Sequence, residues 1–174
     1  MGSFLMNFQG PLLSYIILLY IVVNKARALS PDGQALVSFR TTILSSDGVL
    51  LQWRPEDPDP CGWKGVKCDP KSKRVTSLSL PNHKLSGSIS SDVGKLEHLR
   101  FLALHDNSFY GTVPSALGNC TELKSLSLPN HKLSGSISSD VGKLEHLRFL
   151  ALHDNSFYGT VPSALGNCTE LKSL

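Results

Sequence analysis

The sequence lacks a long apolar segment and a strong net charge. Its longest uncharged apolar run is Leu12–Val23, which is little more than half the length of a membrane-spanning helix, since such a helix needs about 20 residues. No later segment is apolar enough to cross a bilayer. With a formal net charge of +3 over 174 residues, the composition gives no reason to expect nucleic acid or an anionic membrane surface as a partner. What is left is an ordinary globular chain with room for one domain.

Catalytic and metal-binding signatures are also missing from the sequence. It contains no glycine-rich phosphate loop and no His-Arg-Asp or Asp-Phe-Gly element. Its histidines are three positions that each recur once in a later, identical segment, and they form no compact set of three ligands. They are His83, His98, His105, His131, His146 and His153. We therefore expect no enzyme activity, no cofactor and no metal ion.

Residues 1–28 have the pattern of a secretory signal. The apolar run has the length of a signal's central region, and Ala26-Arg27-Ala28 supplies the small-x-small motif before a cleavage site. Basic residues follow the run but none precedes it, so an uncleaved anchor is the alternative. The pattern predicts a secreted chain in the extracellular space, in the apoplast or at the cell surface, that is soluble once the segment is removed.

Two of the four cysteines lie close together. In an oxidising compartment Cys61 and Cys68 are natural disulfide partners because they close a short loop, which would stabilise the fold by about 2–3 kcal/mol. Two cysteines without a nearby histidine do not supply the four ligands of zinc. Cys120 and Cys168 occupy the same position in two copies of one repeated segment. We expect both as buried thiols without a bond between them.

One long segment of the chain occurs twice. Ser77–Leu126 and Ser125–Leu174 are identical, and each copy contains a weaker repeat at half the offset between the copies. The four units, which we call coils one to four, are residues 75–98, 99–122, 123–146 and 147–170, and a fifth begins at Leu171. Each opens with L-x-x-L-x-L, the short strand of a leucine-rich repeat. Units that cannot bury an apolar face alone must stack. The period therefore predicts an α/β solenoid, a right-handed superhelix of leucine-rich repeats.

Residues 29–74 precede the repeats and differ from them. Ser30-Pro31-Asp32 predicts the start of a helix. The helix runs on through Gly33–Leu44, with Ala35, Leu36, Phe39 and Ile43 on one face, and ends at Ser45–Gly48. A short apolar run, a turn-rich link and the Cys61–Cys68 loop follow. A solenoid needs a cover over the apolar end of its first coil, and we interpret this segment as a disulfide-bonded N-terminal cap.

One polar position recurs at the turn that leaves each strand. Asn107 and Asn155 fall where such repeats place an asparagine whose amide satisfies buried backbone groups. His83 and His131 take this position in the other two units. An imidazole could do part of the same work, so we expect slightly weaker coils there.

Several motifs now resemble a known family. Leu85-Ser86-Gly87-Ser88-Ile89 and Val113-Pro114-x-x-Leu117-Gly118 resemble the plant-specific class of leucine-rich repeats. The tryptophans and cysteines of residues 53–68 resemble the plant N-terminal cap of such repeats. More narrowly, LSPDGQALVSFR, LLQWRPEDPDPCGWKGVKCDPKSKRV and LGNCTEL resemble the extracellular start of the FEI-type receptor-like kinases.

The resemblance implies an ectodomain that recognises peptides, wall components or partner ectodomains, followed by a membrane helix and a cytoplasmic kinase. This sequence departs from that plan in three ways. It contains neither the membrane helix nor the kinase. Ser90 and Ser138 stand where the family has a proline after isoleucine. The verbatim duplication is not a feature of the family.

The candidate ligand-binding residues lie on the predicted concave sheet. Alternation along each strand turns Leu102 and Leu104 inward and their neighbours outward. The outward residues are Phe101, Ala103, His105 and Asp106 in coil two, and Phe149, Ala151, His153 and Asp154 in coil four. Exposed aromatic and ionisable groups suit a recognition surface, although solvated strand residues are the simpler interpretation. The duplication doubles this patch without adding a new one.

Two further modification sites are expected. Asn119-Cys120-Thr121 and Asn167-Cys168-Thr169 match the acceptor sequence for N-glycosylation. Both follow from the same duplicated unit, so they count as one observation.

The sequence thus predicts a non-enzymatic extracellular recognition module that binds a protein, a peptide or a cell-wall ligand. Another leucine-rich repeat ectodomain is one such partner, and membrane contact would come only through an uncleaved signal or missing C-terminal sequence. The alternative is a truncated ectodomain of a receptor-like serine/threonine kinase, because the fifth strand starts and stops and leaves coil four uncovered. Such an open end should associate. A third hypothesis is an inert, decayed or misassembled copy, because fifty identical residues imply a very recent duplication or an assembly error.

Overall fold

The computed structural model describes residues 12–19 and 28–173 of the chain. Residues 12–19, which belong to the apolar run, form a helix. The cleavage motif at 26–28 lies outside the described residues except for its last member, so the signal peptide stays a prediction. In the described part of the chain, no helix is both long and apolar enough to cross a bilayer.

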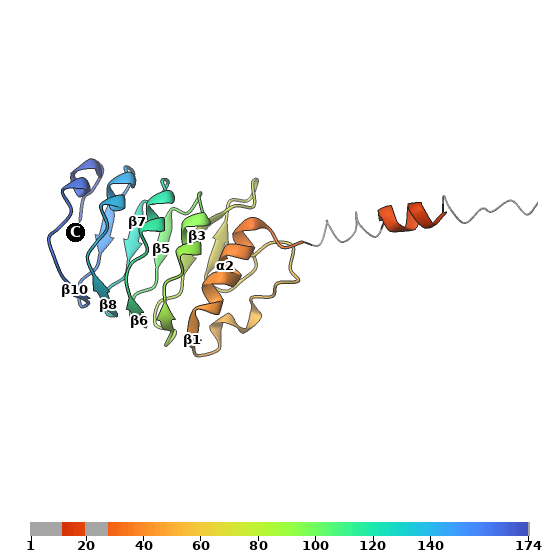
Figure 1. Cartoon of the computed structure of the whole chain (residues 1–174), viewed down its shortest axis with the longest axis horizontal. Coiled ribbons are helices and arrows are strands. Elements are labelled where there is room, and N and C mark those ends of the chain that lie inside the picture. The colour runs from red at the N-terminus through yellow and green to blue at the C-terminus, as the bar shows by residue number, and fades with distance from the viewer. Residues whose placement is uncertain (1–11, 20–27, 174) are drawn as a thin grey trace, which may run out of the picture.

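One of the two sheets is built from the repeated L-x-x-L-x-L segments (Figure 1). This first sheet has the order β2 (Val66–Cys68), β3 (Val75–Ser79), β5 (Phe101–Ala103), β7 (Ser125–Ser127) and β9 (Phe149–Ala151). Strand β2 is antiparallel to β3, and the other four are parallel. Leu78, Leu102, Leu126 and Leu150 stand opposite one another. The period of the repeat therefore sets the register of the sheet.

A second sheet was not predicted from the sequence. It has the order β1 (Ile43–Ser45), β4 (Ser86–Ser88), β6 (Ser108–Gly111), β8 (Lys132–Gly135) and β10 (Ser156–Phe157). Strand β1 comes from the cap and pairs antiparallel with β4. Gly87 permits this pairing because a Cβ atom there would lie 2.1 Å from the carbonyl oxygen of Thr42. The Leu-Ser-Gly segment is thus a strand as well as a turn.

The opposite side of each coil is a short 3₁₀ helix rather than an α-helix. These helices are η2 (Ser91–Lys95), η3 (Ser115–Asn119), η4 (Ser139–Lys143) and η5 (Ser163–Asn167). Ser90 stands in place of the family's proline and accepts a hydrogen bond from the Asp92 amide at 3.2 Å, whereas Pro114 opens η3 without a side-chain cap. The serine therefore replaces proline as a helix start. The prediction of a leucine-rich repeat solenoid with a disulfide-bonded cap is confirmed.

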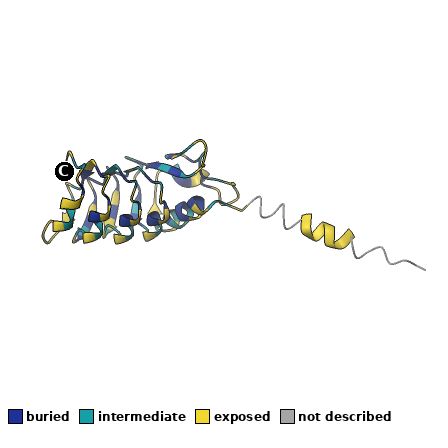
Figure 2. Cartoon of the chain, turned by 90° about the horizontal axis from the view of Figure 1, so that it is seen from above, coloured by how far each residue is buried: buried dark blue, intermediate teal, exposed yellow. Residues whose placement is uncertain are grey.

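The core is continuous along the axis of the array (Figure 2). Buried leucines of the strands face the 3₁₀ helices in every coil. Copies of one sequence are buried differently according to their neighbours: Phe109 is fully buried and Phe157 only partly, and Leu117 is buried whereas Leu165 is half-buried. Burial in this fold is therefore a property of stacked pairs of coils.

The cap is joined to the first coils by aromatic packing. Helix α2 (Pro31–Thr41) begins at Ser30, whose hydroxyl oxygen accepts from the Gly33 amide at 3.2 Å. Phe39 of this helix lies 6.3 Å from the ring of Trp53 and 6.1 Å from that of Phe109. Since Phe109 belongs to coil two, the cap and the repeats share one core.

The predicted end of this helix was wrong. Helix α2 stops at Thr41, and the 3₁₀ helix η1 (Val49–Gln52) forms the second helical piece. Ile43 and Leu44 belong to strand β1 instead of the helix. The reason is tertiary: pairing with β4 offers the backbone of these residues hydrogen bonds that a further helical turn would forfeit.

A disulfide and a buried ion pair complete the cap. Cys61 and Cys68 are bonded as predicted, with their Cα atoms 5.4 Å apart. The buried Asp32 carboxylate accepts from the Arg74 guanidinium at 3.0–3.1 Å and from the Val75 amide at 2.6 Å. These contacts tie the start of α2 to the first strand of the repeats, and the carboxylate raises the pKa of Arg74.

Asn107 and Asn155, which together we call the asparagine ladder, each form hydrogen bonds with the backbone of two neighbouring coils. Asn107 Oδ1 accepts from the amides of His83 and Leu85 at 3.0 and 2.9 Å, and its Nδ2 donates to the carbonyls of Leu80 and Leu104 at 2.8 and 2.6 Å. Its amide thus satisfies the turn of coil one as well as its own.

Asn155 bridges coils three and four in the same way. It accepts from the Leu133 amide at 3.1 Å and donates to the carbonyls of Leu128 and Leu152 at 2.7 and 3.0 Å. Alternate coils can therefore carry a different residue at this position.

The histidines at this position do not form the backbone hydrogen bonds that the asparagines form. His83 Nδ1 lies 2.8 Å from Asp47 of the cap rather than on backbone groups, and neither ring nitrogen of His131 has a hydrogen-bond partner. The prediction that an imidazole does part of the asparagine's work was wrong. In coil one the Asn107 side chain already accepts from the His83 and Leu85 amides. In coil three Asn155 accepts from the Leu133 amide, and the His131 amide donates to the Asp154 carbonyl.

Candidate recognition site on the first sheet

The outward face of the first sheet presents a line of residues in register. Phe101 pairs with Ser77 on one side and Ser125 on the other, and Ser125 pairs with Phe149. Phe101 is 48% exposed and Phe149 40%. Neighbouring strands lie about 4.8 Å apart, so the two rings project from backbones about 10 Å apart with a serine between them.

In coil two the candidate residues are held in place by neighbours. His105 Nδ1 lies 2.8 Å from Asp106 Oδ2, and Asn130 of coil three donates to the other carboxylate oxygen. The imidazole, followed by the Asn130 amide, lowers the pKa of Asp106. Ala103 is half-buried between these groups and the phenylalanine. The structure thus brings the four predicted residues of coil two together on one face.

The matching residues of coil four are arranged more loosely. His153 Nε2 lies 3.9 Å from Asp154 Oδ2, and both side chains are exposed. The contrast has a local cause, because coil three supplies Asn130 to Asp106 whereas no described residue supplies an equivalent amide to Asp154. The two patches share a sequence but differ in rigidity.

One predicted surface residue contributes little surface. Ala151 is only 5% exposed, in contrast to the half-buried Ala103. Its inclusion among exposed residues is corrected, and coil four offers Phe149, His153 and Asp154.

A ladder of charged residues beside the phenylalanines was missed. Glu122 accepts from His98 and Arg100 at 2.6 and 3.0 Å, and its pKa is lowered by Arg100 and then by His98. The same set recurs in the second copy as His146, Arg148 and Glu170. The signal was available in the sequence, as His-Leu-Arg and Glu-Leu-Lys triplets that alternate from one coil to the next.

These charges line an open hollow next to the aromatic line. Its volume is about 430 Å³ and its walls are Arg100, Glu122, Lys124, His146, Arg148 and Glu170. Both signs of charge are therefore within reach of a ligand that covers the phenylalanines.

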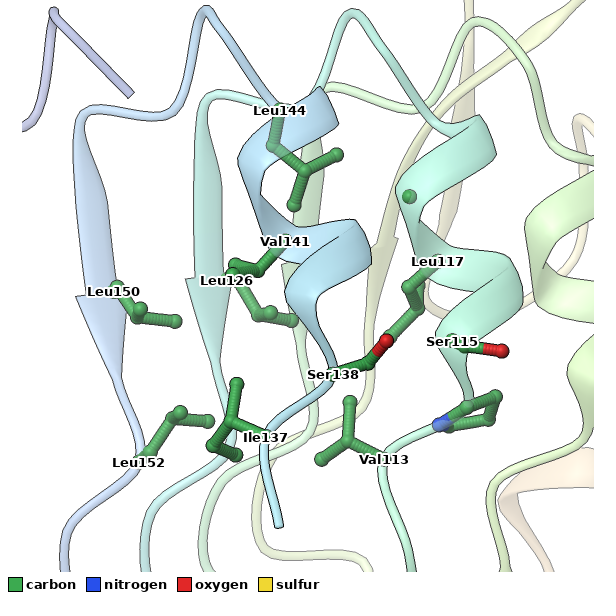
Figure 3. Close-up of a pocket in the computed structure, with 12 residues that line it drawn as sticks. Val113, Ser115, Leu117, Leu126, Ile137, Ser138, Val141, Leu144, Leu150 and Leu152 are labelled. Atoms are coloured by element: carbon green, nitrogen blue, oxygen red, sulfur yellow. The ribbon is translucent and has the colours of Figure 1, made fainter. Parts of the chain in front are cut away.

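The narrow apolar space between the coils is not a binding site (Figure 3). It has a volume of about 30 Å³, roughly one water molecule, and is lined by side chains such as Val113, Leu126, Ile137 and Leu150. A space this small and apolar is a packing gap, since it offers a ligand neither room nor polar partners.

A larger apolar hollow of about 300 Å³ lies on coil four, lined among others by Leu152, Phe157, Tyr158 and Val161. Whether it associates stays a prediction.

The two remaining cysteines are structural. Cys120 and Cys168 are unbonded and buried, and their thiols donate to the carbonyls of Val93 and Val141 at 3.4 Å. Burial raises the pKa of Cys120 to about 12 and also raises that of Cys168. Within residues 12–19 and 28–173, no group of three or more metal-ligating side chains occurs.

The buried thiols lead to a direct prediction. Because the thiolate is the reactive form, we expect the folded protein at pH 8 to react with an aromatic disulfide reagent far more slowly than a free thiol. After unfolding in denaturant without a reductant, two thiols per chain should react. The release of thiolate chromophore measures both. Rapid reaction of two thiols in the folded protein would contradict the structure.

Parallel strands, an asparagine ladder, 3₁₀ helices and a disulfide-bonded cap define a capped leucine-rich repeat protein. The family models agree: a leucine rich repeat N-terminal domain matches residues 29–69, and a leucine rich repeat matches residues 98–120 and 146–168. The LRR receptor-like serine/threonine-protein kinase FEI 2 of Arabidopsis thaliana is 58% identical over 89 residues, which are 51% of this chain and 15% of FEI 2.

Solved structures give the same result. The ectodomain of the receptor kinase SOBIR1 from Arabidopsis thaliana is 30% identical, with a TM-score of 0.69 over 83% of this chain and 77% of that one. The ectodomain of GASSHO1/SCHENGEN3 from the same plant, solved in complex with CASPARIAN STRIP INTEGRITY FACTOR 2, is 36% identical, with a TM-score of 0.78 over 82% of this chain and 17% of that one. The chain belongs to the leucine-rich repeat family, in the form found in the ectodomains of plant receptor-like kinases.

Proposed function

We propose that this chain is a non-enzymatic extracellular recognition module that binds a protein or peptide through the outward face of the first sheet. The observation that carries the proposal is the pair of exposed phenylalanines, Phe101 and Phe149, on a rigid parallel sheet. Exposed aromatic side chains aligned on one face favour a site that a partner covers. The charged ladder beside them supplies polar contacts for the rim.

Similar proteins support the choice of partner. The GASSHO1/SCHENGEN3 ectodomain was solved with a bound factor, and its sheet has the same fold as this one. A cell-wall ligand and a second leucine-rich repeat ectodomain are narrower versions of the proposal. Extracellular location and N-glycans on Asn119 and Asn167 belong to it too, and both asparagine side chains are exposed.

A second candidate follows from the identity with FEI 2. The chain spans about 15% of the length of that kinase, so this region could act as the extracellular part of a receptor-like serine/threonine kinase. The division of the chain into a signal at 1–28, a cap at 29–74 and repeats at 75–174 is shared by both candidates. Long-read transcripts that extend past codon 174 distinguish the two.

Site-specific photo-crosslinking tests the proposed face. A benzophenone amino acid replaces Phe101 or Phe149 in the secreted chain, and Tyr110, an exposed aromatic residue of the second sheet, is the matched control. After irradiation in plant extracellular fluid, we expect one shared adduct from the two phenylalanine positions and none from the control. Adducts only from Tyr110, or no adduct from either phenylalanine position, would refute the proposal.

A further inference from the structure

His131 is a buried histidine without a hydrogen-bond partner. It is 8% exposed, and both Nδ1 and Nε2 are buried and unpaired. Only its backbone is engaged, through the amide that donates to the Asp154 carbonyl at 3.1 Å. The centroids of its ring and of the Phe109 ring lie 5.3 Å apart, and the two ring planes are inclined at 86°. A neutral imidazole tolerates this site better than an imidazolium, which brings a charge and a second donor into it.

The backbone carbonyls of Leu104 and Asn107 lie near the His131 ring, but neither completes a hydrogen bond with Nδ1 or Nε2 in the geometry of the structure. The Asp106 carboxylate, the nearest negative charge, already accepts from His105 and Asn130. The carbonyls of Leu104 and Asn107 and the charge of Asp106 raise the pKa of His131, but burial outweighs them and His105 adds to its effect, so the pKa falls below the ordinary 6.5. A cation–π attraction to Phe109 would offset only part of the lost hydration.

The same repeat position in coil one has the opposite setting. His83 Nδ1 lies 2.8 Å from Asp47 Oδ2, and both side chains are partly exposed. That carboxylate comes from the cap, and the imidazole lowers its pKa. Coil three has no cap beside it, so the duplication placed an identical histidine where no carboxylate forms a hydrogen bond with its ring.

We propose that His131 makes the array sensitive to acid at coil three: protonation of its imidazole loosens this coil and uncouples coil four from coils one and two. Coils contact only their neighbours. Coil three therefore carries the connection between the rigid patch at Phe101 and the looser patch at Phe149. In mild acid the Phe149 patch would lose its fixed position relative to the Phe101 patch, while the cap and coil one stay folded.

The sign of the effect follows from linkage. When folding lowers the pKa of a histidine, its contribution to stability is fully present above the pKa of the unfolded state, about 6.5. The contribution is lost as the pH falls from there toward the lower pKa of the folded state. Within that interval the folding equilibrium constant falls about tenfold for each pH unit. Folding lowers the pKa values of carboxylates such as Asp47 and Asp106, so their contribution to stability is lost in more acid solution than that of a histidine. The window from pH 7.5 to 5.0 therefore reports histidines.

Urea unfolding of the secreted chain between pH 7.5 and 5.0 tests the proposal. His131→Asn and His131→Phe remove the titrating group, and His83→Asn is the matched control. We expect either His131 variant to gain stability relative to the unsubstituted protein as the pH falls, by up to about tenfold per pH unit, and His83→Asn to show no such gain. The same pH dependence of stability in the unsubstituted protein and in all three variants would overturn the proposal. If one of the two His131 variants does not fold, the other provides the test.

Amide exchange measured by mass spectrometry locates the effect. The two copies give identical peptides, so a marker substitution at the exposed Ser136, Ser136→Thr, separates coil three by mass in every protein compared. After correction for intrinsic exchange, we expect protection at the Leu128 and Leu133 amides to fall first in acid. Earlier loss at the His83 and Leu85 amides of coil one would contradict the proposal.

Discussion

Replacement of Asn107 by alanine is expected to destabilise the protein by about 3–5 kcal/mol. The change leaves the buried amide of Leu85 and the buried carbonyls of Leu80 and Leu104 without partners, and each such group costs about 1–3 kcal/mol. Urea unfolding at pH 7.5 measures the loss.

The duplication supplies the control for this substitution. Asn155→Ala removes the same contacts in coils three and four, but Asn155 is partly exposed, so water can replace some of them. We expect its cost to be about 1–2 kcal/mol. If the two substitutions lower the free energy of unfolding equally, the deeper burial of Asn107 does not determine how much its hydrogen bonds stabilise the protein.

Replacement of Phe39 by alanine is expected to cost about 3–5 kcal/mol, as for other fully buried phenylalanines. Phe39 is completely buried between Trp53 of the cap and Phe109 of coil two. Its loss opens a cavity at the junction of cap and repeats, so both parts should unfold together at a lower urea concentration. Fluorescence of the cap tryptophans and circular dichroism of the whole chain follow the two parts.

Leu44→Ala is the matched control for Phe39→Ala. Leu44 follows the same helix but is 72% exposed, so its truncation should change stability by less than about 0.5 kcal/mol. If Phe39→Ala also costs less than about 1 kcal/mol, or if the cap melts separately from the repeats, the shared core is not what holds them together.

The repeat period was sufficient to predict the first sheet. Side chains alternate along a strand, so the positions of Leu102 and Leu104 determine that Phe101 faces outward, and the structure agrees. The helix start at Ser30, the disulfide and the burial of Cys120 were also accessible, because each depends on local sequence and on one assumption about the compartment.

Features that depend on neighbouring coils were not accessible. The second sheet arises because Leu-Ser-Gly segments (β4 and β8) alternate with Ser-Phe-Tyr-Gly segments (β6 and β10) of the neighbouring coils, and the end of α2 depends on pairing between β1 and β4. Two further features depend on contacts between units: Asn107 accepts from a backbone amide of coil one, and the imidazole of His131 has no hydrogen-bond partner. A sequence read one repeat at a time shows what each unit contains but not what the adjacent unit satisfies.

The central claim is that the phenylalanine line of the first sheet forms the recognition surface. The decisive measurement is the Kd of the partner captured by photo-crosslinking for the unsubstituted chain, for Phe101→Ala/Phe149→Ala, and for Tyr110→Ala/Tyr158→Ala. Tyr110 lies in the second sheet, and Tyr158 directly follows its strand β10. Loss of two aromatic anchors predicts weakening by at least about 30-fold, with unchanged thermal stability and little effect of the tyrosine pair. An equal loss of affinity in both double variants, or none in the first, would contradict the account.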